Sequence, residues 1–224
     1  MKALGLFSLK NRVAVVLGGT SGIGLAIARG FAEAGATTIA SSRDQAKVDS
    51  TAAELEALGA HTLRMTSDVQ DRASLQRLCD EVVLAYGQVD VLMVTSGAHK
   101  KTPSAELTEE EWNKVIDINL NGTFRANQIF GRQMLKQRRG AIINTCSMTT
   151  FVSFDEVAVY SASKAGVHML TRSLACEWAH ARGPGECDCA RGVPHAVERE
   201  GAGHSGAHHL DYRADADGAG RRRE

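Results

Sequence analysis

Tyr160 and Lys164 are the residues whose types and spacing point most directly to chemistry. They stand four positions apart in the run YSASK, so a helix would place both side chains on one face. A free tyrosine titrates near ~10, but a lysine cation one helical turn away favours the phenolate. A tyrosine pKa lower by roughly three units requires about 4 kcal/mol, which a desolvated cleft can supply. An isolated pair of this kind is more often a buried tyrosine and a solvated lysine, so other motifs must decide.

A glycine-rich turn, GGTSGIG, follows a continuous apolar run over residues 13–17. Gly18 permits a tight turn, Gly22 lets the backbone approach a pyrophosphate, and Gly24 lets a helix and a strand pack closely. The free N–H groups and the positive end of the following helix favour a phosphate. Against the alternative of a merely structural turn, this context predicts a dinucleotide site that includes Gly18, Thr20, Ser21, Gly22, Ile23 and Gly24.

Segments typical of strands and helices alternate along the chain. Apolar or alternating runs predict strands over residues 13–17, 37–40, 62–66, 89–94 and 141–145. Helical spacing predicts helices over residues 23–34, 45–58, 73–86, 109–137 and 157–179. Because strands that alternate with helices form parallel sheets through right-handed crossovers, the expected fold class is α/β, a doubly wound parallel sheet of the Rossmann type.

Taken together, these motifs resemble the short-chain dehydrogenase/reductase family, and the resemblance covers residues 6–179. It includes Asp68 and Val69, where the family contacts adenine, and Asn119 in VIDINLNG, which matches the family's catalytic asparagine. Two positions depart from the family pattern. The sequence VTSG replaces Asn-Asn-Ala-Gly after the fourth strand, so that only Gly97 matches, and Leu17 replaces the threonine that opens the glycine motif.

The resemblance implies hydride transfer between a nicotinamide cofactor and a carbonyl or alcohol. Tyr160 would act as the general acid/base, and Ser147 would polarise the substrate carbonyl. Lys164 would bind the nicotinamide ribose and lower the pKa of the tyrosine. Asn119 would hold a water molecule that extends the proton relay from the lysine.

The residues after the second strand bear on the choice of cofactor. Family members that use NAD place an acidic residue there, whereas this chain has Ser42 followed by Arg43. No carboxylate repels a 2′-phosphate, and Arg43 can pair with one. NADP is therefore the expected cofactor, with NAD as the alternative if Arg43 only stacks on adenine or caps a helix.

The segment after the fourth strand bears on the substrate. Residues 99–103 and the run EEEWNKVIDINLNG resemble gluconate 5-dehydrogenase relatives most closely. A basic cluster of His99, Lys100 and Lys101 either attracts an anionic substrate or belongs to a solvated loop. The expected substrate is a sugar acid such as gluconate, a polyol or a 3-oxoacyl compound.

The balance of charge excludes several classes of partner. The chain has 26 basic and 26 acidic side chains, so no global field favours nucleic acid or an anionic membrane. No apolar run has the length of a membrane span and the N-terminus does not resemble a signal peptide, so a cytoplasmic location is expected. The 5 cysteines are irregularly spaced, which indicates neither a disulfide framework nor a metal site. The family resemblance also implies a homotetramer.

Residues 181–224 differ in character from the domain predicted over residues 1–180. Glycine, alanine, arginine and histidine dominate there, which predicts a disordered segment. The family normally continues with further strands and a substrate lid, and a shifted reading frame makes residues 183–192 and 214–220 compatible with such segments. We therefore expect that a frameshift replaced the C-terminal strands and lid. The alternative functions are a non-catalytic cofactor-binding or interaction module, or an inactive truncated product.

Overall fold

The computed structural model describes residues 7–179, so the segment predicted over residues 181–224, with its expected disorder and frameshift, lies outside the described residues. Within the described range a 4-stranded parallel sheet has the order β2-β1-β3-β4. The strands are β1 (Val13–Leu17), β2 (Thr37–Ser41), β3 (Val91–Val94) and β4 (Ala141–Asn144). The strand β1 is buried along its whole length, as its apolar run predicts for a strand covered on both faces.

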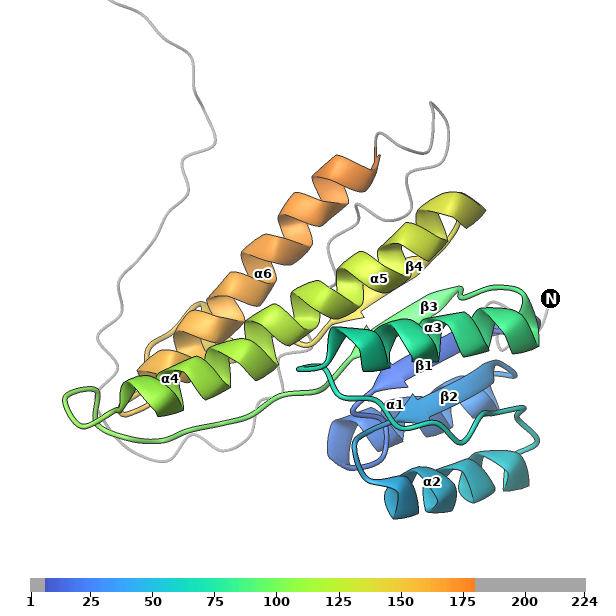
Figure 1. Ribbon diagram of the computed structural model, residues 1–224, viewed down its shortest axis with the longest axis horizontal. Coiled ribbons are helices and arrows are strands. Elements are labelled where there is room, and N and C mark those ends of the chain that lie inside the picture. Colours follow the sequence, from blue (N-terminus) through green and yellow to red (C-terminus); the bar gives the residue numbers. More distant parts are fainter. Residues whose placement is uncertain (1–6, 180–224) are drawn as a thin grey trace, which may run out of the picture. The chain divides into compact units, whose positions relative to one another are not determined.

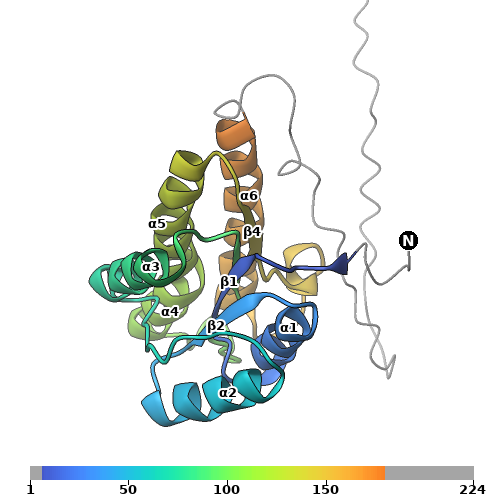
Figure 2. The same ribbon diagram turned by 90° about the vertical axis from the view of Figure 1, so that its right-hand side faces the viewer.

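The helices that cover the two faces of the sheet are α1 (Gly22–Glu33), α2 (Gln45–Ala57), α3 (Arg72–Tyr86) and α5 (Gly122–Gln137) (Figures 1 and 2). On one face, α1 and α2 pack against Val16, Ala40 and Met93. On the other face, α3 and α5 pack against Val15 and Leu17. Neighbouring residues of β1 thus enter opposite layers, and the doubly wound α/β prediction is confirmed.

The prediction of a strand over residues 62–66 is wrong, because the backbone there does not form one. This segment runs beside β2, where the Thr38 N–H donates to the His61 carbonyl over 2.9 Å, but it does not form a regular strand. The Met65 carbonyl instead accepts from the Ser41 hydroxyl over 2.6 Å. The alternating pattern was informative about side chains, because Leu63 and Met65 pack against the core. A strand also requires a regular ladder of backbone hydrogen bonds, which side-chain alternation alone does not specify.

The helix predicted over residues 109–137 has three parts, namely α4 (Glu109–Ile116), the π-helical turn η2 (Asp117–Asn121) and α5. A capping box at Thr108 starts α4. The π-helical turn includes Asn119, which is fully buried. Short π-helical turns inside longer helices often occur at functional sites, so this interruption draws attention to the asparagine.

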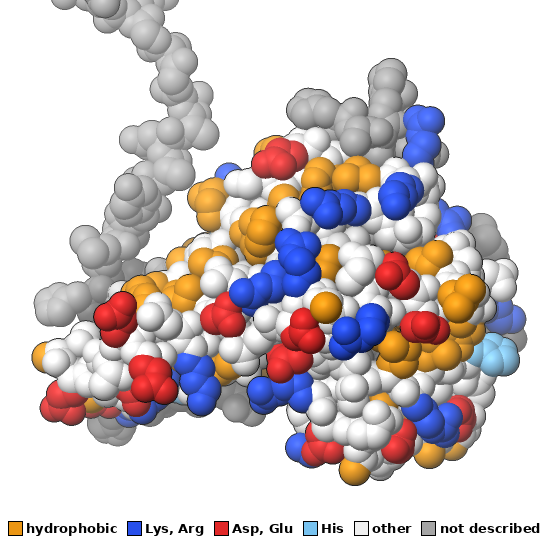
Figure 3. Space-filling model, viewed as in Figure 1, with side chains coloured by type: hydrophobic (Ala, Val, Ile, Leu, Met, Phe, Trp, Pro, Cys, Tyr) orange, Lys and Arg blue, Asp and Glu red, His pale blue; other side chains and the backbone are white. Residues whose placement is uncertain are grey.

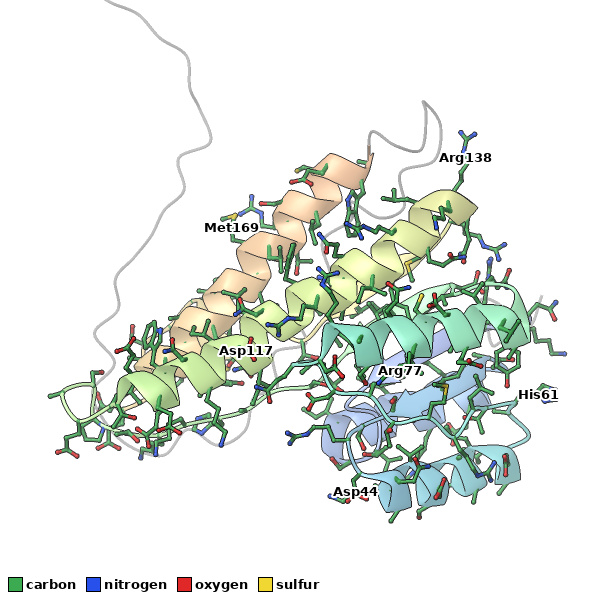
Figure 4. The ribbon with its side chains drawn as sticks, in the orientation of Figure 1. Asp44, His61, Arg77, Asp117, Arg138 and Met169 are labelled. Carbon is green, nitrogen blue, oxygen red and sulfur yellow. The ribbon has the colours of Figure 1, made fainter. Side chains whose placement is uncertain are left out.

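The last described helix, α6 (Ala158–Ala179), lies alongside α5 in both views (Figures 1 and 2). The 3-10 turn η3 (Met148–Thr150) precedes it. Figure 4 shows Asp117 at the η2 turn and Met169 on α6, where this methionine is 56% exposed.

Charged side chains of both signs are interspersed over the face seen in Figure 3, in agreement with the balanced composition. Within residues 7–179, no helix combines the length and apolar character needed to cross a membrane.

Candidate active site

The carboxyl ends of the parallel strands bring the predicted site residues to one edge of the sheet. The glycine-rich turn begins after β1, Ser42 follows β2, and Gly97 lies beyond β3. Ser147 follows β4, and α6 then carries Tyr160 and Lys164. Ligands of open α/β sheets bind at this edge, so the topology gathers residues that are far apart in the sequence.

Three glycines of the turn each have a structural reason of their own. Gly18 adopts a φ of +79°, and a Cβ there would lie 2.8 Å from the Ser96 backbone nitrogen. A Cβ on Gly24 would collide with the Gly18 carbonyl, so this glycine lets α1 approach the turn. Gly22 has a φ of +51° and faces open space, where a ligand can approach the backbone. The Ser21 side chain makes no capping hydrogen bond to α1, which leaves first-turn N–H groups for an anion.

The two departures from the family pattern contact each other directly. The Thr95 hydroxyl donates to the Leu17 carbonyl over 2.8 Å, and the Thr95 N–H donates to the same carbonyl over 2.9 Å. The loop after β3 is thereby tied to the end of β1. In the adjoining turn Thr20 is buried, whereas Ile23 is 61% exposed and leaves an apolar side chain at the surface beside Gly22.

Lys164 is buried within the site. It is only 5% exposed, and its Nζ donates to the Thr145 carbonyl at the end of β4 over 2.7 Å. The same Nζ lies 5.9 Å from the centre of the Tyr160 ring, and a Cβ on Gly97 would lie 3.8 Å from it. Burial lowers the pKa of Lys164, and the Coulombic effect of Cys146 opposes this. Because an ammonium group is costly to bury, its position beside a tyrosine indicates a functional role.

Asn119 ties together the loop after β3, the π-helical turn and α6. Its Oδ1 accepts from the Ala98 N–H over 2.7 Å, and its Nδ2 donates to the Ala98 carbonyl over 2.9 Å. Nδ2 also donates to the Ser163 hydroxyl oxygen over 2.9 Å. That hydroxyl in turn donates to the Tyr160 carbonyl over 2.7 Å. The asparagine therefore clamps the helix that carries the tyrosine.

Ser147 and Tyr160 are both half-buried at this edge. The Ser147 Oγ accepts from the Thr149 N–H over 3.2 Å, so its hydroxyl hydrogen remains available to a ligand. The Tyr160 ring packs against the His99 ring, with centres 4.8 Å apart and planes inclined at 60°. The structure thus brings Tyr160 and Lys164 together. Ser147 follows Thr145, whose carbonyl binds this lysine, by two residues in the sequence.

The residues predicted to contact the adenosine end of the cofactor follow β2 in the sequence. The Ser67 N–H donates to the Ser42 carbonyl over 3.0 Å. The Ser42 hydroxyl is buried and has no hydrogen-bond partner among the described residues. Arg43 is exposed, Asp68 is half-buried and Val69 is buried. The Ser42 hydroxyl and the Arg43 guanidinium therefore both lie just after β2.

The sequence did not predict one pair of hydrogen bonds in this site. Ser163 lies inside the YSASK run, yet only the structure shows that it joins Asn119 to the Tyr160 carbonyl. The motif marked the right segment, but a contact across 44 positions has no signal in a single sequence.

The two lysines of the basic cluster are ion-paired. Lys100 Nζ lies 2.5 Å from a Glu111 carboxylate oxygen, and Lys101 Nζ lies 3.4 Å from a Glu156 carboxylate oxygen. These lysines therefore fasten the loop to neighbouring segments. The geometry does not favour the interpretation that they attract an anionic substrate.

Comparison with known families agrees with this geometry. A family model described as short chain dehydrogenase matches residues 12–182. The chain belongs to the short-chain dehydrogenase family. The matched range runs from β1 through α6, so it includes the glycine-rich turn, Asn119 and the pair of Tyr160 and Lys164.

Individual relatives are similar over most of the described chain. D-threitol dehydrogenase of Mycolicibacterium smegmatis is 38% identical over 173 residues, which cover 77% of this chain and 66% of the relative. The 2-dehydro-3-deoxy-D-gluconate 5-dehydrogenase of Pseudoalteromonas atlantica is 38% identical over 174 residues, covering 77% and 68%. A solved gluconate 5-dehydrogenase from Burkholderia cenocepacia, in complex with NADP and tartrate, has a TM-score of 0.76 and 32% identity, covering 80% of this chain and 70% of that one. The chain spans about two thirds of the length of the curated relatives it matches.

Proposed function

We propose that the chain is an NAD(P)-dependent oxidoreductase that interconverts a secondary alcohol and a ketone. The observation that carries this proposal is the buried Lys164 ammonium beside the Tyr160 ring, at the same sheet edge as the glycine-rich turn. The lysine places a positive charge near the ring that carries the proposed acid/base hydroxyl, and the turn offers N–H groups to a pyrophosphate. The named relatives are dehydrogenases, which agrees with this reaction class.

The residues around the turn fit a dinucleotide cofactor. The backbone at Gly22 faces open space, and the first turn of α1 lacks a side-chain cap. In this proposal the Ser42 hydroxyl, which has no hydrogen-bond partner among the described residues, bonds a ribose hydroxyl or a 2′-phosphate. We favour NADP over NAD because Arg43 is exposed there and Ser42 provides no carboxylate. When bound, the nicotinamide ring supplies or accepts the hydride.

The side chains of the site divide the remaining work. In the direction of reduction, the Tyr160 hydroxyl gives a proton to the carbonyl oxygen, and in oxidation it takes the proton back. The free hydroxyl hydrogen of Ser147 bonds the same oxygen and polarises the carbonyl. Lys164, held by the Thr145 carbonyl, keeps positive charge beside the phenolate that proton loss leaves. It also binds the nicotinamide ribose in this proposal.

We assign Asn119 a structural part in this site besides its predicted water-holding role. Within the described residues its side-chain hydrogen bonds go to Ala98 and Ser163, so the amide is already engaged in holding the loop after β3 and α6. The Asn119 main-chain carbonyl also has a partner, because it accepts from the Thr123 hydroxyl over 2.6 Å.

The substrate that we propose is a small polyhydroxylated compound, either a polyol or a sugar acid such as gluconate. Relatives are named for D-threitol and for 2-dehydro-3-deoxy-D-gluconate, which supports this class. A 3-oxoacyl compound is the alternative. We also propose a homotetramer in which α5 and α6 pair with other copies, since Phe124 on α5 and Met169 on α6 are 40% and 56% exposed.

Turnover of NADPH with a panel of small ketones tests the proposed reaction. We expect the wild-type chain to oxidise NADPH with at least one ketone, and Tyr160→Phe to lower kcat by about 100-fold or more. Equal rates in the two proteins would reject the assignment of Tyr160. Binding of NADPH without turnover by the wild type would support the second candidate, a non-catalytic cofactor-binding module, which the composition of residues 181–224 favours.

The frameshift proposed for residues 181–224 has a separate test. The coding DNA is expected to spell family-like segments when it is read in the shifted frame. Codons that cannot do so would reject the frameshift and leave the assignment of the described site unaffected.

A further inference from the structure

We propose that His99 is a positioning residue that holds the Tyr160 ring in one orientation for proton transfer. This inference rests on the proposed function, because it gives the tyrosine its acid/base task. The direct observation is the edge-to-face contact between the two rings, with centres 4.8 Å apart and planes at 60°. Edge-to-face packing at such a distance is a favoured arrangement of aromatic rings.

The tyrosine needs such a contact because it is only half-buried. Its backbone is fixed by the bond from Ser163 to the Tyr160 carbonyl, but that bond leaves the side-chain torsions free. Lys164 approaches the ring to 5.9 Å and donates its hydrogen bond elsewhere, to Thr145. Within the described residues, the contact with the His99 ring therefore restrains the direction of the phenol.

The histidine can restrain another ring only if its own loop is held on both sides. On one side, Ala98 exchanges two hydrogen bonds with the Asn119 amide. On the other side, Lys100 and Lys101 are ion-paired with carboxylates at 2.5 and 3.4 Å.

A backbone bond completes the attachment of the loop. The Thr102 N–H donates to the Glu156 carbonyl over 2.7 Å, and this residue lies just before α6. The loop is thus attached to η2, to α4 and to the segment that leads into the tyrosine helix. The basic residues of this loop therefore place an aromatic ring against the acid/base residue.

Nuclear magnetic resonance of the tyrosine rings tests the contact in the full chain without requiring activity. The chain contains 3 tyrosines, so selective ring labelling gives few signals, and Tyr160→Phe identifies the one of interest. We expect His99→Ala to move the Tyr160 ring signals toward those of a free tyrosine, because the neighbouring ring current is lost. His99→Phe keeps an aromatic ring and should keep a distinct shift.

A matched control comes from His168 on α6, the helix that also carries Tyr160. His168 makes a similar edge-to-face contact with Phe151, with centres 5.2 Å apart. His168→Ala removes a contact of the same kind and should leave both the Tyr160 signals and turnover unchanged. It thus separates a specific effect of His99 from a general loss of aromatic packing.

Kinetics test the consequence for proton transfer. With any ketone that the wild type reduces, His99→Ala should lower kcat about three- to tenfold, a size set by one aromatic pair, with KM changed less than about twofold. His99→Phe should restore most of kcat. Unchanged Tyr160 signals in His99→Ala, or an unchanged kcat, would overturn the proposal. An inactive wild type would instead count against the proposed function, and the ring signals would still decide whether His99 restrains Tyr160.

Discussion

Replacement of Lys164 by methionine should make the fold more stable while removing the activity. The residue is 5% exposed, and within the described chain its Nζ has one hydrogen bond, to the Thr145 carbonyl at 2.7 Å. Removing an ammonium from water costs several kcal/mol, whereas a hydrogen bond from a charged donor returns about 1.5–3 kcal/mol. Methionine has a similar length and no charge, so Lys164→Met should stabilise the protein by about 1–2 kcal/mol.

Thermal unfolding measured by circular dichroism tests this expectation. At a few degrees for each kcal/mol, Tm should rise by about 2–6 °C at pH 7. Tyr160→Phe is the matched control, since it removes the proposed acid/base hydroxyl without removing a buried charge, and its Tm should stay within about 2 °C of the wild type. A clear fall of Tm in Lys164→Met would mean that the lysine stabilises the fold, which would refute the reasoning.

The sign of the pH dependence follows from the lowered pKa of Lys164. Burial depresses the pKa in the folded state, so between that value and the ordinary lysine value the unfolded chain binds more protons. Stability of the wild type should therefore rise with pH through this window, whereas the methionine variant lacks that contribution. The difference in Tm between the two proteins is expected to shrink as the pH approaches 10. A difference that grows with pH would contradict this linkage.

Four further substitutions, one of them a control, probe the glycine-rich turn, the clamp formed by Asn119 and the choice of cofactor. Gly24→Ala should destabilise the protein by about 1–3 kcal/mol in urea unfolding, because its Cβ would meet the Gly18 carbonyl, whereas Gly30→Ala on the same helix meets nothing within 4 Å and should stabilise by about 0.5–1 kcal/mol. Asn119→Ala should cost about 2–4 kcal/mol in the same assay, since buried partners are left unpaired; a loss below about 0.5 kcal/mol would argue against the clamp. Arg43→Ala should weaken NADPH binding about tenfold in a fluorescence titration and leave NADH binding nearly unchanged, and equal losses for both cofactors would remove Arg43 from the 2′-phosphate site.

Local patterns predicted most of the fold because they report burial directly. The run VAVVL specified a strand covered on both faces, and the structure buries all of its residues. The alternation over residues 62–66 agrees with the packing of the partly buried Leu63 and Met65 against the core. It failed for the backbone because a regular ladder with β2 depends on the partner strand, which the pattern of one segment does not describe.

The places of the candidate residues in the fold could be predicted from the sequence, but the hydrogen bonds that connect them could not. Tyr160 and Lys164 follow from helical spacing, and the sheet topology brings Ser147 to the same edge. The bonds of Asn119 could not be predicted, because a π-helical turn changes which side of the helix a residue faces and leaves no periodic signal. The ion pairs of Lys100 and Lys101 could not be predicted either, since their partners lie in other segments of the chain.

Transfer of deuterium from NADPH that carries deuterium at both hydrogen positions of the nicotinamide C4 is the most direct measurement of the central claim. The full chain is incubated with the labelled cofactor and each ketone of the panel, and the alcohol product is examined by mass spectrometry. A single deuterium on the carbinol carbon, formed by the wild type and lost in Tyr160→Phe, is the predicted result. Alcohol formed at the same rate by both proteins, or NADPH bound firmly by the wild type with no labelled alcohol from any ketone, would contradict the account.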